Sequence, residues 1–182
     1  MAQKRKPDQN KKIMDAALSH AGKVGWDALT IRDIAKKAKM SEEAVTRIYA
    51  DVWDILLDIL KKLDADTLAE AGKMPDESWR DNLFEILMSR FDVMEEDRHA
   101  FTALSCALAR APAAAPRFVR PFGRSMRDML QHAGAPATPL HVAAFGIFYL
   151  SIVEVWKNDE TADLSKTMAA VDKRLGMLER FF

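Results

Sequence analysis

Apolar residues recur at intervals of three and four along almost the whole chain, and this periodicity restricts the fold more than any other feature of the sequence. Val52, Ile55, Ile59 and Leu63 form one such stripe. No segment shows the sustained alternation of apolar and polar residues that is typical of strands. The sequence therefore predicts an all-α fold.

Glycine and proline are sparse, and they fall mainly between the periodic segments. Thr30 and Ser41 stand at the starts of two segments, where a hydroxyl caps the free N–H groups of a helix. We expect nine helices, over residues 13–24, 30–37, 41–49, 52–71, 77–94, 97–110, 115–133, 139–157 and 163–182.

The charge of the chain is distributed unevenly. Residues 1–50 hold 11 Lys and Arg against 6 Asp and Glu, a net charge of +5, whereas residues 51–182 hold 16 against 21, a net charge of −5. A cationic N-terminal segment suits an anionic partner such as nucleic acid. We therefore expect a head over residues 1–50 and a larger helical body over residues 51–182, about six helices in size.

The sequence indicates a cytoplasmic protein. Cys106 is the only cysteine, so no intramolecular disulfide can form. The first residues are polar and basic and lack the apolar stretch of a secretory signal. The longest apolar run, residues 142–153, is shorter than the roughly 20 residues that cross a bilayer, so we expect no stable membrane insertion.

The sequence does not predict an enzyme. His20, His99, His132 and His141 are scattered without the spacing of metal ligands, and the chain lacks a nucleophile elbow, a phosphate-binding loop and a dinucleotide fingerprint. We expect no catalytic residues, no metal and no cofactor.

The pattern of residues 30–49 predicts two short helices with a tight turn between them. Ile34, Ala35 and Ala38 are the apolar or small residues that a close helix crossing requires, and Val45 would hold the second helix against the core. A helix-turn-helix presents the start of its second helix to a DNA major groove. An ordinary helical hairpin fits the same packing, so both interpretations stay open on these residues alone.

The segment IMDAALSHAGKVGWDALTIRDIAKKAKMSEEAVTRIYADVWDILLDIL resembles the N-terminal head of TetR-type regulators, and YLSIVEVWKNDETADLSKTMAAVDKRLGMLE resembles the last two helices of a TetR subgroup. The resemblance implies a TetR-like fold and a ligand-responsive repressor that binds an inverted-repeat operator in double-stranded DNA as a homodimer. The C-terminal pattern also resembles the TetR-fold accessory proteins of ubiquinone biosynthesis. The alternative is therefore a lipid-binding protein that no longer binds DNA.

The resemblance places the DNA contacts in the head. They are Thr30, Arg32, Lys37, Lys39, Ser41, Glu42, Glu43, Thr46, Arg47 and Tyr49. Two departures stand out: Lys39 occupies a position where the family usually has glycine, and Glu42 and Glu43 put negative charge where the helix would enter the groove. Basic residues between positions 4 and 12 add phosphate donors in a mobile tail, although a solvated terminus would have the same composition.

The middle of the chain is rich in phenylalanine and methionine, and in TetR-like proteins this region holds an effector pocket. The predicted pocket residues are Leu87, Phe91, Phe101, Leu104, Phe118, Phe122 and Met126. The effector would be small and apolar or lipid-like. The same residue types at helical spacing also make an ordinary core, and the residues do not separate the two interpretations.

The last two helices carry heptad-like apolar stripes, which suit a four-helix bundle between two subunits. The predicted dimer interface comprises Phe145, Tyr149, Ile152, Trp156, Met168, Val171, Leu175 and Leu178. Alternatively, both stripes pack within their own subunit.

Arg117, Arg120, Arg124 and Arg127 follow one another at helical spacing. They predict either a solvated cationic face or a site for an anionic ligand or membrane surface.

Overall fold

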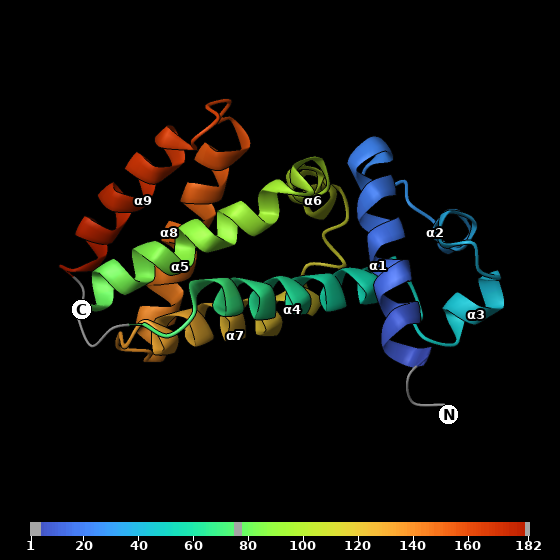
Figure 1. Ribbon diagram of the computed structural model, residues 1–182, viewed down its shortest axis with the longest axis horizontal. Coiled ribbons are helices and arrows are strands. Elements are labelled where there is room, and N and C mark those ends of the chain that lie inside the picture. Colours follow the sequence, from blue (N-terminus) through green and yellow to red (C-terminus); the bar gives the residue numbers. More distant parts are fainter. Residues whose placement is uncertain (1–4, 75–77, 181–182) are drawn as a thin grey trace. The chain divides into compact units, whose positions relative to one another are not determined.

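The computed structural model describes residues 5–74 and 78–180, and over these ranges the chain consists of nine α-helices without strands (Figure 1). The all-α prediction is confirmed. The helices are α1 (Arg5–Val24), α2 (Ile31–Ala38), α3 (Glu42–Thr46), α4 (Val52–Ala71), α5 (Trp79–Glu95), α6 (Arg98–Arg110), α7 (Pro116–His132), α8 (Pro139–Lys157) and α9 (Ser165–Leu178).

The largest difference from the predicted boundaries is at the N-terminus. Helix α1 begins at Arg5, eight residues before Ile13, where the apolar stripe begins. The backbone tolerates Pro7 because it falls in the first turn, where the missing N–H has no partner to lose. The basic segment that was predicted as a mobile tail is therefore helical from Arg5 onward, while residues 1–4 lie outside the described residues.

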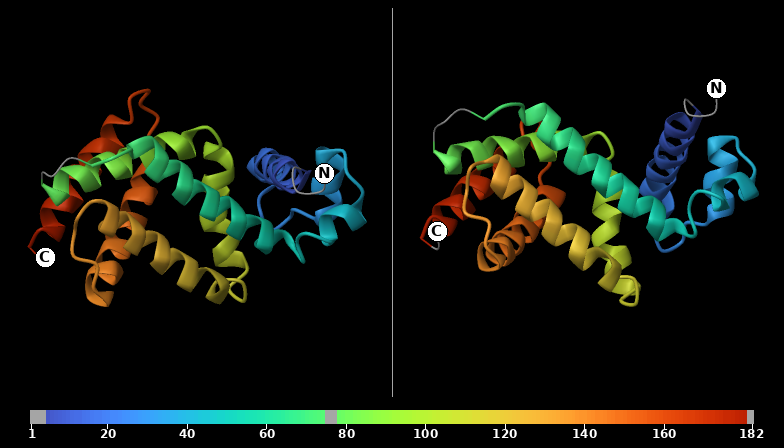
Figure 2. Two further views of the ribbon diagram at one scale, coloured as in Figure 1. Left: turned by 60° about the horizontal axis from the view of Figure 1, so that its bottom comes forward. Right: turned by 90° about the horizontal axis from the view of Figure 1, so that it is seen from below.

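The chain divides into two compact units. The first comprises residues 1–62 and 96–118, with α1, α2, α3, α6 and the first part of α4. Within it α1 lies between α6 and α2, as all three views show (Figures 1 and 2). Trp26 closes this contact: its ring is buried and its Nε1–H donates to the carbonyl oxygen of Ala100 on α6 at 2.8 Å.

The second unit comprises residues 63–95 and 119–182. Helix α9 packs on both α8 and α5 in this unit. Helix α8 is long and apolar enough, by length and composition, to cross a membrane. Its Phe145, Ile152 and Trp156 are buried, so this face of the helix contributes to the core of the unit.

The division by packing differs from the expected head and body, because α6 belongs with α1 although it is far away in sequence. The head over residues 1–50 and the body over residues 51–182 stay a functional prediction.

Candidate nucleic-acid interface

Helix α2 begins at a hydroxyl cap and ends in a left-handed residue. The Oγ1 of Thr30 accepts a hydrogen bond from the backbone N–H of Asp33 at 3.2 Å. Thr30, one of the predicted DNA contacts, therefore caps the N-terminus of α2. At the other end Lys39 has φ 56° and ψ 43°, a backbone conformation that glycine adopts without strain. That conformation lets the N–H of Met40 reach the carbonyl oxygen of Ala35 at 2.9 Å, which closes the turn toward α3.

Helix α3 is the short second helix of the pair. The Oγ of Ser41 accepts from the backbone N–H of Ala44 at 3.2 Å, as the sequence predicted for a cap. Val45 is fully buried and fixes the helix on the core of its unit. The outer face of the helix is exposed and carries Glu42, Glu43 and Thr46, with Arg47 directly after it. This face has the position that a recognition helix requires.

The negative charge at the start of α3 is partly compensated. The Nε of Arg32 on α2 lies 3.4 Å from Oε2 of Glu42, which makes an ion pair between the two helices of the motif. The pKa of Glu43 is lowered by its own backbone N–H, by the Ser41 hydroxyl and by the charge of Arg47, so this carboxylate is ionised at neutral pH. Glu42 therefore has a cationic partner on α2. The carboxylate of Glu43 interacts instead with groups of α3 and its two flanking residues.

Tyr49 does not lie on the exposed face. Its side chain is buried, and its hydroxyl donates to Oδ2 of Asp58 on α4 at 2.9 Å. Burial and this hydrogen bond raise the pKa of the phenol. The structure thus corrects the expectation of Tyr49 as a DNA donor, because the hydroxyl is already used inside the unit. The other nine predicted contacts are exposed: Thr30, Arg32, Lys37, Lys39, Ser41, Glu42, Glu43, Thr46 and Arg47.

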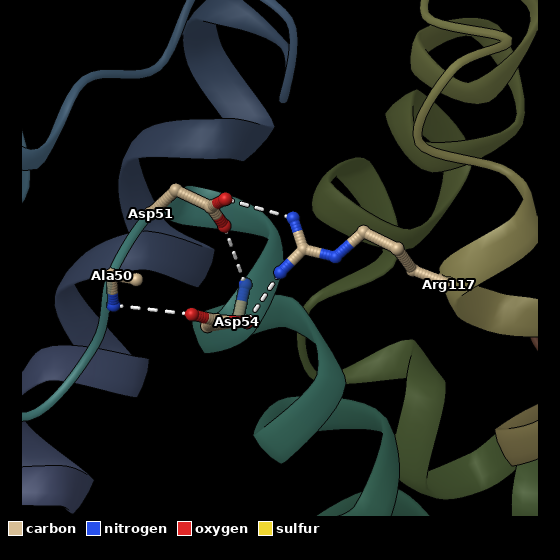
Figure 3. Close-up of polar contacts among 4 residues, drawn as sticks. All are labelled: Ala50, Asp51, Asp54 and Arg117. Carbon is tan, nitrogen blue, oxygen red and sulfur yellow. Dashed lines mark hydrogen bonds and ion pairs between the residues drawn. The ribbon is translucent and has the colours of Figure 1, made fainter.

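Sequence reasoning missed a clamp that holds the segment after α3. Arg117, in the first turn of α7, binds Oδ2 of Asp51 through Nη1 at 2.8 Å and binds Asp54 through Nη2 (Figure 3). The two aspartates also cap α4, since Asp51 accepts from the N–H of Asp54 and Asp54 accepts from the N–H of Ala50. One arginine therefore fixes the chain between α3 and α4.

The predicted pocket residues are divided between the two units. In the first unit, Phe118 is buried edge-on to Trp53, with ring centroids 6.0 Å apart. In the second, Phe91 is fully buried between Tyr149 and Trp156, with centroid distances of 6.2 and 5.9 Å. These contacts are those of a core, and the use of the residues by an effector stays a prediction.

A hollow between the end of α4 and α5 has different walls from the predicted apolar pocket. It is lined by Glu70, Ala71, Lys73, Met74, Asp81, Asn82, Glu85 and Ser89. Most of these side chains are polar, so this hollow does not suit an apolar effector.

The predicted dimer stripe faces inward. Seven of its eight residues are buried in their own unit and are not available to a partner: Phe145, Tyr149, Ile152, Trp156, Val171, Leu175 and Leu178. Met168 is the exception, with 43% of its surface exposed. The exposed apolar residues of α8 lie on its other face and are Leu140, Ile147 and Leu150. The heptad pattern thus marked the core face of both helices.

Comparison with known proteins agrees with this geometry. Residues 13–51, which include α2, the turn and α3, match the family model described as bacterial regulatory proteins, tetR family. Over these residues the chain matches the TetR family. It is similar to the HTH-type transcriptional repressor KstR of Mycolicibacterium smegmatis, with 27% identity over 95% of this chain and 86% of the relative. It is thus a transcriptional regulator with a DNA-binding helix-turn-helix.

Solved structures of TetR regulators share the fold of this chain. A TetR transcriptional regulator from Nitrosomonas europaea superposes with a TM-score of 0.79 and 17% identity, over 94% of this chain and 98% of the other. The fatty acid degradation regulator FadR from Bacillus halodurans superposes with a TM-score of 0.62 and 15% identity, over 93% of this chain and 94% of the other. Because the similar proteins are regulators, the alternative of a lipid-binding accessory protein is not favoured.

Proposed function

We propose that this TetR-family chain is a ligand-responsive repressor that binds an inverted-repeat operator as a homodimer in the cytoplasm. The observation that carries the proposal is the capped α3 helix, with Thr46 and Arg47 exposed and Val45 anchored beneath them. In this orientation α3 offers its outer face to the base edges of a major groove, while the exposed lysines of α2 and the turn contact phosphates.

Two relatives support the regulatory part of the proposal. KstR is named a repressor, and FadR is named a regulator of fatty acid degradation. A repressor needs a signal that releases it, and the phenylalanine- and methionine-rich interior of the second unit offers adaptable apolar surface to a small effector.

The homodimer follows from the geometry of operator DNA. Two copies of α3 must lie about 34–36 Å apart to enter successive major grooves on one side of the duplex. Leu140, Ile147 and Leu150 form an exposed stripe along α8 that suits a helix of a second copy.

The test is selection of operator sequences from random DNA, followed by affinity measurements at several salt concentrations. We expect an inverted repeat to be enriched, and Arg47→Ala to weaken its binding by about 1–3 kcal/mol. Arg124→Ala, which removes another exposed arginine, on α7, serves as the matched control and should leave the affinity unchanged. Failure to enrich any sequence, or equal effects of the two variants, would contradict operator binding through α3.

A further inference from the structure

A buried cation lies in the interior of the second unit. Arg90 of α5 is 4% exposed, and its Nε donates to the hydroxyl of Tyr149 on α8 at 2.9 Å. Its Nη1 donates to Oδ1 of Asp64 on α4 at 2.7 Å, and the guanidinium also lies 5.3 Å from the centroid of the Tyr149 ring. Ser125 of α7 donates to the same Asp64 oxygen at 2.6 Å. Four helices thus contribute to one polar cluster.

The ion pair in this cluster is unequal. The Arg90 side chain is 5% exposed, whereas that of Asp64 is 28% exposed, so the cation lies deep and the carboxylate lies near the surface. Arg90 meets only one oxygen of Asp64, and that oxygen is shared with Ser125. A guanidinium binds a carboxylate best through two parallel hydrogen bonds. Asp64 is therefore an incomplete partner that could move outward into water.

One further polar group on α4, one turn after Asp64, has no hydrogen-bond partner among the described residues. Thr67 follows Asp64 by one turn of α4 and is fully buried, and its hydroxyl has no hydrogen-bond partner among the described residues. A buried hydroxyl without a hydrogen-bond partner is unfavourable. A bound polar group that accepted or donated a hydrogen bond at Thr67 would remove this cost.

The surroundings of Arg90 are apolar and adaptable. Tyr149, which holds the guanidinium, has its ring 6.2 Å from that of Phe91 and 6.1 Å from that of Phe122. Its hydroxyl also lies 3.7 Å from the sulfur of Met94. Flexible thioether and aromatic side chains can rearrange around an inserted apolar group.

We infer that Arg90 is the anchor for an anionic effector, an amphiphile with one carboxylate and an apolar body. The ligand carboxylate replaces Asp64 on the guanidinium, Asp64 moves into water, and the apolar body lies among Phe91, Phe122 and Met94. Thr67 supplies a hydroxyl near the ligand head. This inference rests on the proposed control by an effector and names its chemical class.

Calorimetry on the full chain without DNA tests it, with dodecanoate and 1-dodecanol as probes of equal chain length. We expect dodecanoate to bind at least about tenfold more tightly than dodecanol. Arg90→Met should abolish this preference. Asp64→Asn should strengthen dodecanoate binding several-fold, because the ligand carboxylate no longer competes with the Asp64 carboxylate for Arg90. Arg124→Gln, an exposed arginine on α7, should change neither affinity.

Asp64→Asn separates the inference from a purely structural role. A structural ion pair would be weakened by this variant without any gain in ligand affinity, and that result would overturn the inference. Equal binding of both probes to the parent protein, binding of neither, or a preference that survives in Arg90→Met would overturn it as well. If Arg90→Met does not fold, Arg90→Lys and Asp64→Asn decide, since lysine keeps the charge. Operator binding is measured separately, so a failure here leaves the DNA-binding proposal standing.

Discussion

Arg117 and Asp51 are 66 residues apart in the sequence, and their side chains form an ion pair 2.8 Å long at the start of α4. Arg117→Gln should lower the free energy of unfolding by about 0.5–1 kcal/mol, because both side chains are partly exposed and water screens the pair. Thermal denaturation should show a fall in Tm of roughly 1–4 °C. Arg120→Gln removes an exposed arginine one turn further along α7 and is the control.

Asp159 organises the loop between α8 and α9. It is 1% exposed, and its Oδ2 accepts from both the N–H and the hydroxyl of Thr167 at 2.8 Å, while its Oδ1 accepts from the N–H of Thr161 at 3.0 Å. Asp159→Asn replaces an acceptor by a donor at one of these oxygens. We expect a loss of about 2–3 kcal/mol in unfolding free energy, whereas Glu160→Gln, on an exposed neighbour, should cost almost nothing.

The same carboxylate gives a pH dependence with a defined sign. Burial alone would raise the pKa of Asp159, but the hydrogen bonds from Thr161 and Thr167 outweigh it and lower the pKa well below that of an unfolded aspartate. The stabilisation is therefore complete above the unfolded pKa of about 3.9 and is lost as the pH falls through the lower folded pKa. Denaturation curves of the parent and Asp159→Asn should converge on acidification below pH ~4; a constant difference between pH ~6 and ~2 would contradict this assignment.

Lys39 tests the turn between α2 and α3. A left-handed residue other than glycine destabilises the folded state by about 1–2 kcal/mol. Glycine avoids this strain, but its greater freedom in the unfolded chain lowers the free energy of unfolding by about 0.5–1 kcal/mol. Lys39→Gly should therefore stabilise the protein by up to about 1 kcal/mol and weaken operator binding through the lost cation. Lys39→Ala removes the same charge but keeps the strain, so it should weaken DNA binding without any gain in stability.

The exposed face of α8 gives a test of self-association. Ile147 is 69% exposed on the stripe with Leu140 and Leu150, and Val119 on α7 is 68% exposed. Ile147→Asp should convert a dimer into a monomer in sedimentation experiments, and Val119→Asp, an equally exposed position, should not. If both variants sediment as the parent does, the α8 stripe is not the interface.

Local chemistry allowed much of this structure to be predicted. The caps at Thr30 and Ser41 depend only on a hydroxyl and the N–H three residues later, and both form as expected. Long-range partners were not predictable in the same way. The position of Tyr49 depends on Asp58 across a helix junction. Arg117 has the same spacing in the sequence as the other arginines of α7, and only the fold brings it to Asp51.

The dimer stripe illustrates a second limit. Helix α8 is apolar on two faces, one with Phe145, Ile152 and Trp156 and one with Leu140 and Ile147. Periodicity identifies apolar faces, but it does not say which one lies against the chain's own core. The heptad-like spacing predicts that the more aromatic face meets a partner subunit, whereas in the structure this face fills the interior of the chain's own unit.

The ion pair between Arg32 and Glu42 leads to a test of the recognition surface itself. Glu42 holds the guanidinium of Arg32 at 3.4 Å and adds negative charge where phosphates approach. Glu42→Gln removes this charge and frees Arg32 for a phosphate, so operator affinity should rise about three- to tenfold and the salt dependence should steepen by about one released ion. Glu43→Gln should raise operator affinity less, because Glu43 does not pair with Arg32. Loss of the Glu43 charge also weakens the N-terminal turn of α3. In the double variant Arg32→Ala with Glu42→Gln the salt dependence should return to that of the parent; if it stays steep, simple loss of repulsion explains the gain and Arg32 is not the donor.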